Sequence, residues 1–313
     1  MPYADLKNDV VFRKVFGTHP DVLMGLLNDL LDRHGAHAIT ALEYLPSEQA
    51  PLVMGMKLSI LDVRCRDASG VTFVVEMQVL PITGFLNRVV YNACKAYVGT
   101  LKRGRQYDEL TDVIAVSICD FELWPDAEQR AHGEPLVPLV SRWSMAERTN
   151  GARRGMGQVE YVFLELPKLG ERLPTNVVER WAVLFRSAPD LTPASVVEVP
   201  LTRAQRAALE YAREETMTPS ERDLIARSHE EVDQVRRTIE HEARKARGEG
   251  LKKGVKRGRL LTLRKMLRRI VSARHEALTE EQSQRVDACK RASVLDDWIE
   301  RLLAGESADA VVK

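Results

Sequence analysis

The chain has 313 residues with 46 Lys and Arg, 45 Asp and Glu and a formal net charge of +1, so no overall excess of positive charge marks it as a nucleic-acid-binding protein and any such surface must be local. Its length predicts one α/β domain plus a smaller part, because single hydrophobic cores stop growing at about 250 to 300 residues. The sequence shows no secretory signal and no run of about 20 apolar residues, so we expect neither an exported nor a membrane-spanning protein. Cys65, Cys94, Cys119 and Cys289 lie far apart and form no Cys-x-x-Cys pair. We therefore expect a soluble protein of the reducing cytoplasm.

The first part of the chain predicts two helices followed by strands. Apolar residues recur at helical spacing over residues 7–31, and the break at 17–20 divides them into two helices. Short segments rich in Val, Ile, Leu and aromatic residues predict four strands, at residues 39–44, 57–66, 71–80 and 113–119. A helix over residues 85–103 joins the last two strands, with apolar positions at Leu86, Val89, Val90, Ala93, Tyr97 and Leu101. Such a crossover predicts a mixed sheet with helices on its faces.

The middle of the chain is less regular. Residues 125–157 are rich in turn residues, and their pattern predicts neither a helix nor a strand. Residues 159–166 predict a strand that returns to the same sheet. After Pro193 the pattern becomes mostly helical, with Pro200 and Pro219 at helix starts. We therefore expect the first domain to occupy residues 1–220.

A basic segment follows this domain. Residues 241–270 contain twelve Lys or Arg against two Glu, so the rest of the chain is net acidic. Gly250, Gly254 and Gly258 lie four apart, and each glycine costs a helix about 1 kcal/mol relative to alanine. Residues 221–270 therefore predict a helical, basic linker that is either simply solvated or binds DNA phosphates. The DNA-binding candidates are Arg244, Lys245, Lys252, Lys253, Lys256 and Arg257.

Residues 271–313 predict a small helical module. Apolar residues recur at helical spacing, enough for two helices but not for a stable independent domain. Those residues are Val286, Leu295, Trp298, Ile299, Leu302 and Leu303. We expect any homo-oligomer to form through these helices.

The most informative stretch, residues 57–78, predicts a β-hairpin. Residues 67–70 supply the turn, and a loop centred there places Asp62 opposite Glu76, about 5 Å away on one face of the sheet. Because alternate side chains of a strand point to the same face, Gln78 shares that face. A register shift of one residue would separate the three side chains.

Asp62 and Glu76 together predict a metal site. Two neighbouring carboxylates in an apolar hairpin repel each other and lose hydration, which a divalent cation would compensate. Oxygen ligands of this kind suit Mg²⁺ or Mn²⁺, and such an ion promotes phosphodiester hydrolysis by lowering the pKa of bound water and polarising the phosphoryl group. Taken alone, the spacing leaves open that both residues are ordinary surface charges.

The pattern of a strand Asp, a turn and Glu-x-Gln resembles the PD-(D/E)xK nuclease core, and its flanks are more specific. Residues 7–17, KNDVVFRKVFG, resemble the opening of the recombination-promoting nuclease/transposase family. So do the segments RVVY at 88–91 and GRQYDEL at 104–110, with Tyr97 between them. The resemblance covers about residues 5–125. It implies a restriction-endonuclease-like mixed sheet flanked by helices, and a DNA endonuclease associated with recombination or mobile elements.

The same resemblance assigns roles in the site. Asp62 and Glu76 become the metal ligands, and with Gln78 they form the catalytic set. Gln78 occupies the position where most nucleases of the superfamily have lysine, and a neutral amide can orient by hydrogen bonds but adds no charge. The alternative is therefore a nuclease-fold protein that binds DNA or a partner protein without cleaving. Lys95 would offer a charge, although a solvent-exposed lysine is the simpler interpretation.

Four residues are accessory candidates. Asp9 stands in a first helical turn, where superfamily members often place an acid, but where acids also serve as helix-dipole partners. Arg88, Tyr91 and Lys95, at offsets of three and seven, share one helix face that either contacts DNA or is solvated. Tyr97 belongs to the apolar stripe and predicts a core position. The scattered histidines do not support zinc.

Overall fold

The computed structural model describes residues 3–49, 59–102, 104–133, 135–147, 149, 156–192 and 200–312, and within these it leaves out the side chains of 49, 59, 60, 246 and 249–252. Contacts divide the chain into two compact units, Met1–Gln234 and Val235–Lys313. The expected boundaries near 220 and 270 stay a prediction.

The N-terminal region forms the two predicted helices, α1 (Asp9–Phe16) and α2 (Pro20–Leu31). Asn8 caps α1, since its side chain accepts the backbone N–H groups of Val10 and Val11. Pro20 begins α2, where the missing N–H of proline costs nothing.

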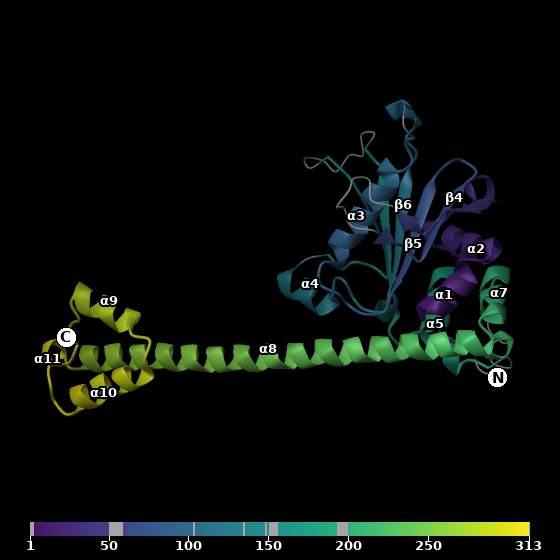
Figure 1. Ribbon diagram of the computed structural model, residues 1–313. Coiled ribbons are helices and arrows are strands. Elements are labelled where there is room, and N and C mark those ends of the chain that lie inside the picture. Colours follow the sequence, from purple (N-terminus) through teal and green to yellow (C-terminus); the bar gives the residue numbers. More distant parts are fainter. Residues whose placement is uncertain are drawn as a thin grey trace. The chain divides into compact units, whose positions relative to one another are not determined.

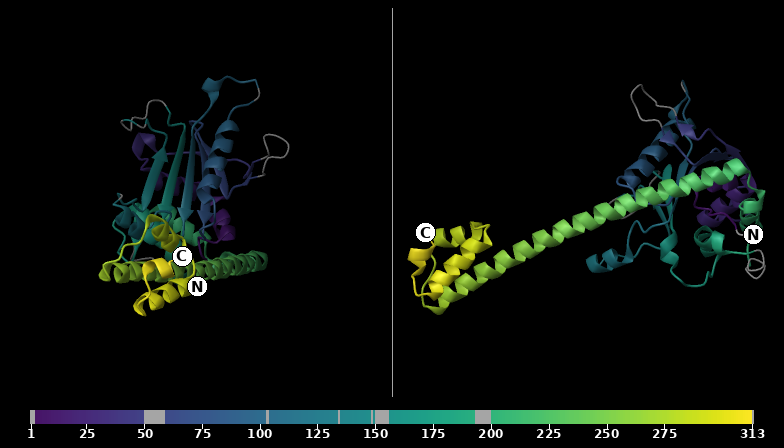
Figure 2. Two further views of the ribbon diagram at one scale, coloured as in Figure 1. Left: turned by 90° about the vertical axis from the view of Figure 1, so that its left-hand side faces the viewer. Right: turned by 60° about the horizontal axis from the view of Figure 1, so that its bottom comes forward.

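A six-stranded mixed sheet forms the centre of the first unit, in the order β1-β4-β5-β6-β8-β7. The β5–β6 and β6–β8 pairs are parallel and the other pairs antiparallel, so the predicted mixed sheet is confirmed. The strands can be followed side by side in the left view of Figure 2. They are β1 (Leu42–Tyr44), β4 (Val63–Asp67), β5 (Thr72–Gln78), β6 (Val113–Cys119), β7 (Val140–Ser144) and β8 (Val159–Glu165). A separate pair joins β2 (Glu48–Gln49) and β3 (Ser59–Ile60).

Several predicted strands differ from the observed ones. The strand expected at 39–44 begins only at Leu42, because the Asn28 side chain binds both the N–H and the carbonyl of Ile39. The strand expected at 57–66 is divided into β3 and β4, and residues 57 and 58 lie outside the described residues. Residues 125–157, for which the turn-rich sequence predicts no element, contain α4 (Asp126–His132) and β7.

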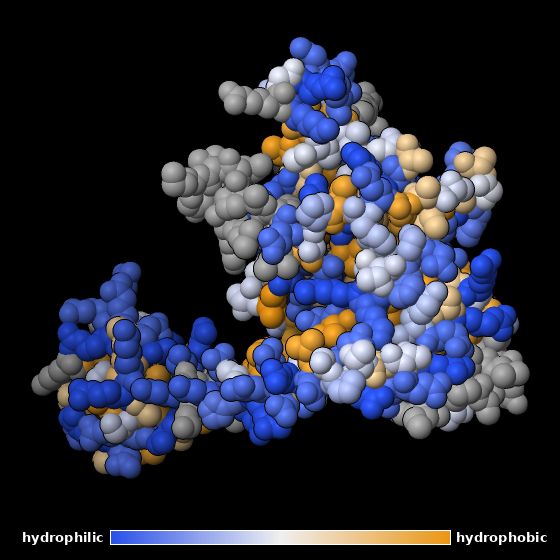
Figure 3. All heavy atoms as spheres, turned by 45° about the vertical axis from the view of Figure 1, so that its right-hand side comes forward, coloured by the Kyte–Doolittle hydropathy of each residue, from blue (hydrophilic) through white to orange (hydrophobic). Residues whose placement is uncertain are grey.

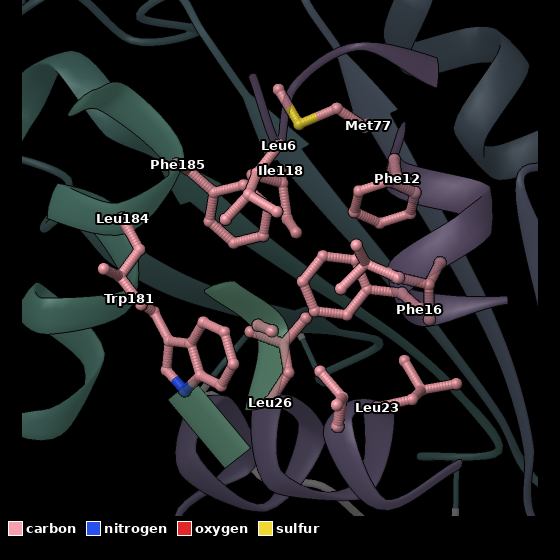
Figure 4. Close-up of a cluster of buried hydrophobic side chains, with 14 of the residues drawn as sticks. Leu6, Phe12, Phe16, Leu23, Leu26, Met77, Ile118, Trp181, Leu184 and Phe185 are labelled. Atoms are coloured by element: carbon pink, nitrogen blue, oxygen red, sulfur yellow. The ribbon is translucent and has the colours of Figure 1, made fainter. Parts of the chain in front are cut away.

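Helices cover both faces of the sheet (Figure 1). One face packs against α3 (Phe85–Val98), in a cluster that includes Val74, Val89 and Phe163. The other face meets α1, α2, α5 (Val177–Ser187) and α7 (Arg203–Tyr211). Figure 4 shows the aromatic centre of that second cluster, formed by Phe12, Phe16, Trp181 and Phe185.

The predicted apolar stripe of α3 is partly wrong. Leu86 and Val90 are 41% and 46% exposed. The helix is rotated so that Phe85, Val89, Asn92, Ala93, Lys95 and Ala96 are its buried residues. Two polar side chains therefore lie on the buried side, which a count of apolar residues does not reveal.

The second unit is built on the end of α8 (Pro219–Ala273), a single 55-residue helix that continues through Gly254 and Gly258. With α9 (Glu280–Ala288), α10 (Ala292–Leu303) and α11 (Ala308–Val311), it forms a small core. The core contains the predicted Val286, Leu295, Ile299 and Leu302, with Trp298 packed against it. Leu303 is exposed, so its expected core position is wrong.

None of the helices in the described part of the chain combines the length and apolar character that a membrane span requires.

The contact between α2 and α7 depends on Gly25. A Cβ atom added there would lie 2.2 Å from the Cβ of Ala204, far inside van der Waals contact. We expect Gly25→Ala to lower the free energy of unfolding of the first unit by about 1–3 kcal/mol, because the two helices must move apart. Denaturant unfolding followed by tryptophan fluorescence measures this change.

The matched control is Gly254→Ala, where the added Cβ meets no atom within 4 Å. Alanine in a helix interior is more stable than glycine by about 0.5–1 kcal/mol. Gly254→Ala should therefore stabilise α8, whereas Gly25→Ala destabilises the α2–α7 contact. Equal effects at the two positions would contradict this account.

Candidate active site

The hairpin around the predicted site has the expected register. Val63 pairs with Val75 and Arg66 with Thr72, and this register continued by one residue brings Asp62 opposite Glu76. The Asp67 side chain holds the turn by accepting the backbone N–H groups of Ser69 at 2.9 Å and Val71 at 3.0 Å. Gly70 then takes a positive φ of 94°, which glycine adopts without strain.

Asp62 lies just before β4, at the point where the β4–β5 ladder ends. One carboxylate oxygen, Oδ2, accepts the backbone N–H of Met77 at 2.8 Å, two residues beyond the last paired residue of β5. The other oxygen accepts a hydrogen bond from Arg13 of α1 at 3.1 Å. The side chain of Asp62 therefore replaces a backbone partner and is fixed against the end of β5.

Glu76 and Gln78 point to the face covered by α3. Between them, Met77 points the other way, into the core drawn in Figure 4. Glu76 Oε1 accepts a hydrogen bond from Asn92 at 2.9 Å, and Glu76 Oε2 accepts one from Arg88 at 3.3 Å. Arg88 also donates to the side-chain oxygen of Gln78. Two residues of α3 thus bind the side chains of Glu76 and Gln78.

The surroundings of Glu76 make its charge costly. Its side chain is buried, with 6% of the residue exposed. Burial raises the pKa of Glu76 above its ordinary value, the Arg88 guanidinium opposes that rise, and the nearby Asp62 carboxylate adds to it. A second cation beside the two carboxylates would lower this cost further.

The donor chemistry of the pair fits a hard divalent cation. Among the described residues, no group of three or more His, Cys, Asp and Glu side chains is arranged to hold a metal ion. The candidate site therefore has two carboxylate ligands, Asp62 and Glu76. Mg²⁺ is commonly bound by one or two carboxylates, with water and substrate phosphate as its other ligands. Each carboxylate oxygen here has a second lone pair besides the one in its hydrogen bond.

The accessory candidates are placed differently from one another. Arg88 lies in the site, where it contacts Glu76 and Gln78. Asp9 accepts a hydrogen bond from Ser228 of α8 at 2.6 Å. Lys95 is only 5% exposed, so the expected solvent-exposed lysine is wrong. Its ammonium group lies 5.8 Å from the centre of the Tyr91 ring, on the buried side of α3. Tyr97 packs against the core beneath α3, as predicted.

Three contacts of this region were missed from the sequence. Arg13 stands within the family-like opening segment but received no role there. Asn92 lies one helical turn after Arg88, and this spacing indicates that the two side chains share one face of the helix. Lys7 forms an ion pair with Asp120 at 2.9 Å, and the backbone N–H of Asp120 binds the carbonyl of Gln78.

The basic segment lies on α8. Lys245, Lys253, Lys256 and Arg257 are exposed, and Arg244 pairs with Glu240 at 3.2 Å. The side chain of Lys252 lies outside the described residues. The second unit carries 20 Lys and Arg against 12 Asp and Glu, whereas the first carries 26 against 33. Positive charge is therefore concentrated in the second unit, whose visible surface in Figure 3 is mainly hydrophilic.

Comparison with known proteins agrees with the fold. The model of the PD-(D/E)XK nuclease family transposases matches residues 6–241, which include the whole sheet and both helical layers of the first unit. No match was found among curated proteins or among solved structures. With three quarters of its length covered by that model, the chain belongs to the PD-(D/E)XK nuclease family of transposases.

Proposed function

We propose that this protein is a Mg²⁺- or Mn²⁺-dependent DNA endonuclease associated with recombination or mobile elements. The observation that carries the proposal is the pair of carboxylates, Asp62 and Glu76, held side by side at the end of the β4–β5 ladder. In the reaction a water oxygen bonds to phosphorus, the bond from phosphorus to one sugar oxygen breaks, and that oxygen takes a proton. Bound Mg²⁺ or Mn²⁺ would lower the pKa of the water and polarise the phosphoryl group.

The chain's own residues fix the two carboxylates. The Met77 N–H holds Asp62 Oδ2, and the Asn92 amide holds Glu76 Oε1. Arg13 and Arg88 each contribute a positive charge to one carboxylate. These contacts orient the pair before a cation or DNA binds, so little reorganisation is left for the reaction.

The basic part of α8 supplies the second half of the proposal. Its exposed lysines and arginines would bind the DNA backbone, which the net negative first unit repels. The four cysteines are free, in keeping with a reducing cytoplasm. Self-association through the C-terminal helices is part of the same proposal, and light scattering coupled to gel filtration tests it.

A plasmid assay tests the catalytic claim. The wild-type protein should convert supercoiled plasmid to nicked or linear DNA in the presence of Mg²⁺ or Mn²⁺, and EDTA should abolish this conversion. No cleavage with either metal, at protein concentrations that bind the plasmid fully, would contradict the proposal.

Gln78 favours a second candidate function. Its amide adds no charge where a lysine is usual, and a nuclease fold without catalysis would act as a DNA- or protein-binding module. Salt-sensitive plasmid binding without cleavage in the assay above would support that candidate, because phosphate contacts weaken as salt rises.

A further inference from the structure

The orientation of the Gln78 amide is fixed by its two partners. Its nitrogen donates a hydrogen bond to the carbonyl of Leu80 at 3.0 Å, and its oxygen accepts one from Arg88. A carbonyl can only accept and a guanidinium can only donate, so the amide cannot be turned over. Gln78 therefore presents its oxygen, and not its NH₂ group, to the site.

Arg88 is held by three groups around the site. The nitrogen Nη2 donates to Gln78 Oε1 and lies 3.3 Å from Glu76 Oε2. The guanidinium carbon lies 5.6 Å from the centre of the Phe85 ring on the same helix. The side chain remains 41% exposed, so the charge also faces solvent, from which a DNA phosphate would approach.

We propose that Arg88 supplies from α3 the positive charge that a lysine at position 78 would supply in related nucleases, and that Gln78 is the residue that positions it. This inference rests on the proposed endonuclease function. In the reaction, the guanidinium would stabilise the negative charge that develops on the phosphoryl oxygens. Gln78 would then hold Arg88 by a hydrogen bond, a role that a neutral amide can fill.

The other cations near the site have different partners. Arg13 binds Asp62 Oδ1 on the side of α1, and Lys7 pairs with Asp120. The ammonium group of Lys95 lies over the Tyr91 ring. Arg88 bonds to the side chains of both Glu76 and Gln78.

A charge-relocation experiment tests the inference. Arg88→Met should lower the kcat of plasmid cleavage by roughly 100-fold, the order found when a single group that stabilises transition-state charge is removed. The double variant Arg88→Met with Gln78→Lys puts a cation back at the motif position and should recover at least about 10-fold of that loss. Arg105→Met is the matched control, because Arg105 is exposed and paired with Glu109, and it should cleave like wild type.

A second readout needs no cleavage. Removing the positive charge next to Glu76 should tighten Mn²⁺ binding, by roughly 10-fold, because the guanidinium repels the ion. Electron paramagnetic resonance of free Mn²⁺ measures this affinity. A residue that only stabilised the fold would weaken both metal binding and cleavage when removed, so opposite signs separate a charge role from a structural one.

The outcomes distinguish this inference from the proposed function. If wild type cleaves and Arg88→Met cleaves equally fast, the role of Arg88 is overturned while the endonuclease remains. If the double variant is no faster than Arg88→Met, the charge at this position is not what cleavage needs. If wild type does not cleave, the endonuclease proposal fails. Independently of cleavage, unchanged or weaker Mn²⁺ binding by Arg88→Met would overturn the electrostatic role of Arg88.

Discussion

Glu76→Gln and Asp62→Asn should each reduce Mg²⁺-dependent plasmid cleavage by roughly 100-fold or more, because each removes one of the two carboxylates proposed to hold the cation. Both substitutions keep the shape of the side chain. In Glu76→Gln the amide oxygen can still accept the hydrogen bond that Asn92 donates to Glu76 Oε1. The measurement is the rate of plasmid nicking over a range of Mg²⁺ concentrations. Wild-type rates in both variants would rule out this metal site.

Thermal unfolding shows whether lost cleavage reflects lost metal binding or lost structure. Mn²⁺ should raise the melting temperature of the wild type, because a ligand that binds only the folded state stabilises it. It should leave both variants nearly unchanged. A variant with a lowered melting temperature in EDTA would point to a damaged fold instead.

The pH dependence of stability provides an independent check on Glu76. Burial raises its folded-state pKa above the unfolded value, so the folded protein binds this proton more tightly. The resulting stability is fully present below the unfolded pKa, near 4.3, and is lost as the pH rises through the raised folded pKa. In EDTA, Glu76→Gln should therefore gain stability relative to wild type as the pH rises above the unfolded value of about 4.3. A constant difference across that range would contradict the raised pKa.

The hairpin could be predicted from sequence because its information is local. Residues 67–70 set the turn, the turn sets the register, and the register brings Asp62 opposite Glu76. The Asp67 side chain, which binds Ser69 and Val71 across the turn, is the physical cause. A side-chain period of two then puts Gln78 beside Glu76.

The partners of the carboxylates could not be predicted in the same way. Arg13 and Asn92 come from helices outside the hairpin, and their contacts depend on how α1 and α3 are rotated against the sheet. The apolar count on α3 gave the wrong rotation, since Leu86 and Val90 are exposed and Lys95 is buried. Packing of Phe85 and Val89 into the core decided the rotation, and with it the meeting of Arg88 and Gln78.

Reversing charges on the basic part of α8 should weaken DNA binding strongly. Each phosphate contact contributes about 0.9 to the slope of log affinity against log salt. Replacing four contacting residues should therefore reduce that slope by about three to four and lower affinity by roughly 100-fold or more at moderate salt. The residues to change to Glu are Lys245, Lys253, Lys256 and Arg257, which are exposed on the helix. Fluorescence anisotropy with a labelled duplex in Ca²⁺ measures affinity over a salt series.

The control carries the same change in charge on the first unit, at four exposed arginines: Arg105, Arg130, Arg203 and Arg206. Arg105 and Arg130 lose only surface ion pairs, with Glu109 and Asp126, and such pairs contribute little to stability. Both variants change the net charge equally, so a general electrostatic effect would weaken DNA binding equally in the two. A loss confined to the α8 variant would mean that this helix contacts the backbone. Equal losses of DNA affinity would mean that the basic segment is simply a solvated helix. DNA would then bind at the first unit, where Arg13 and Arg88 flank the carboxylates.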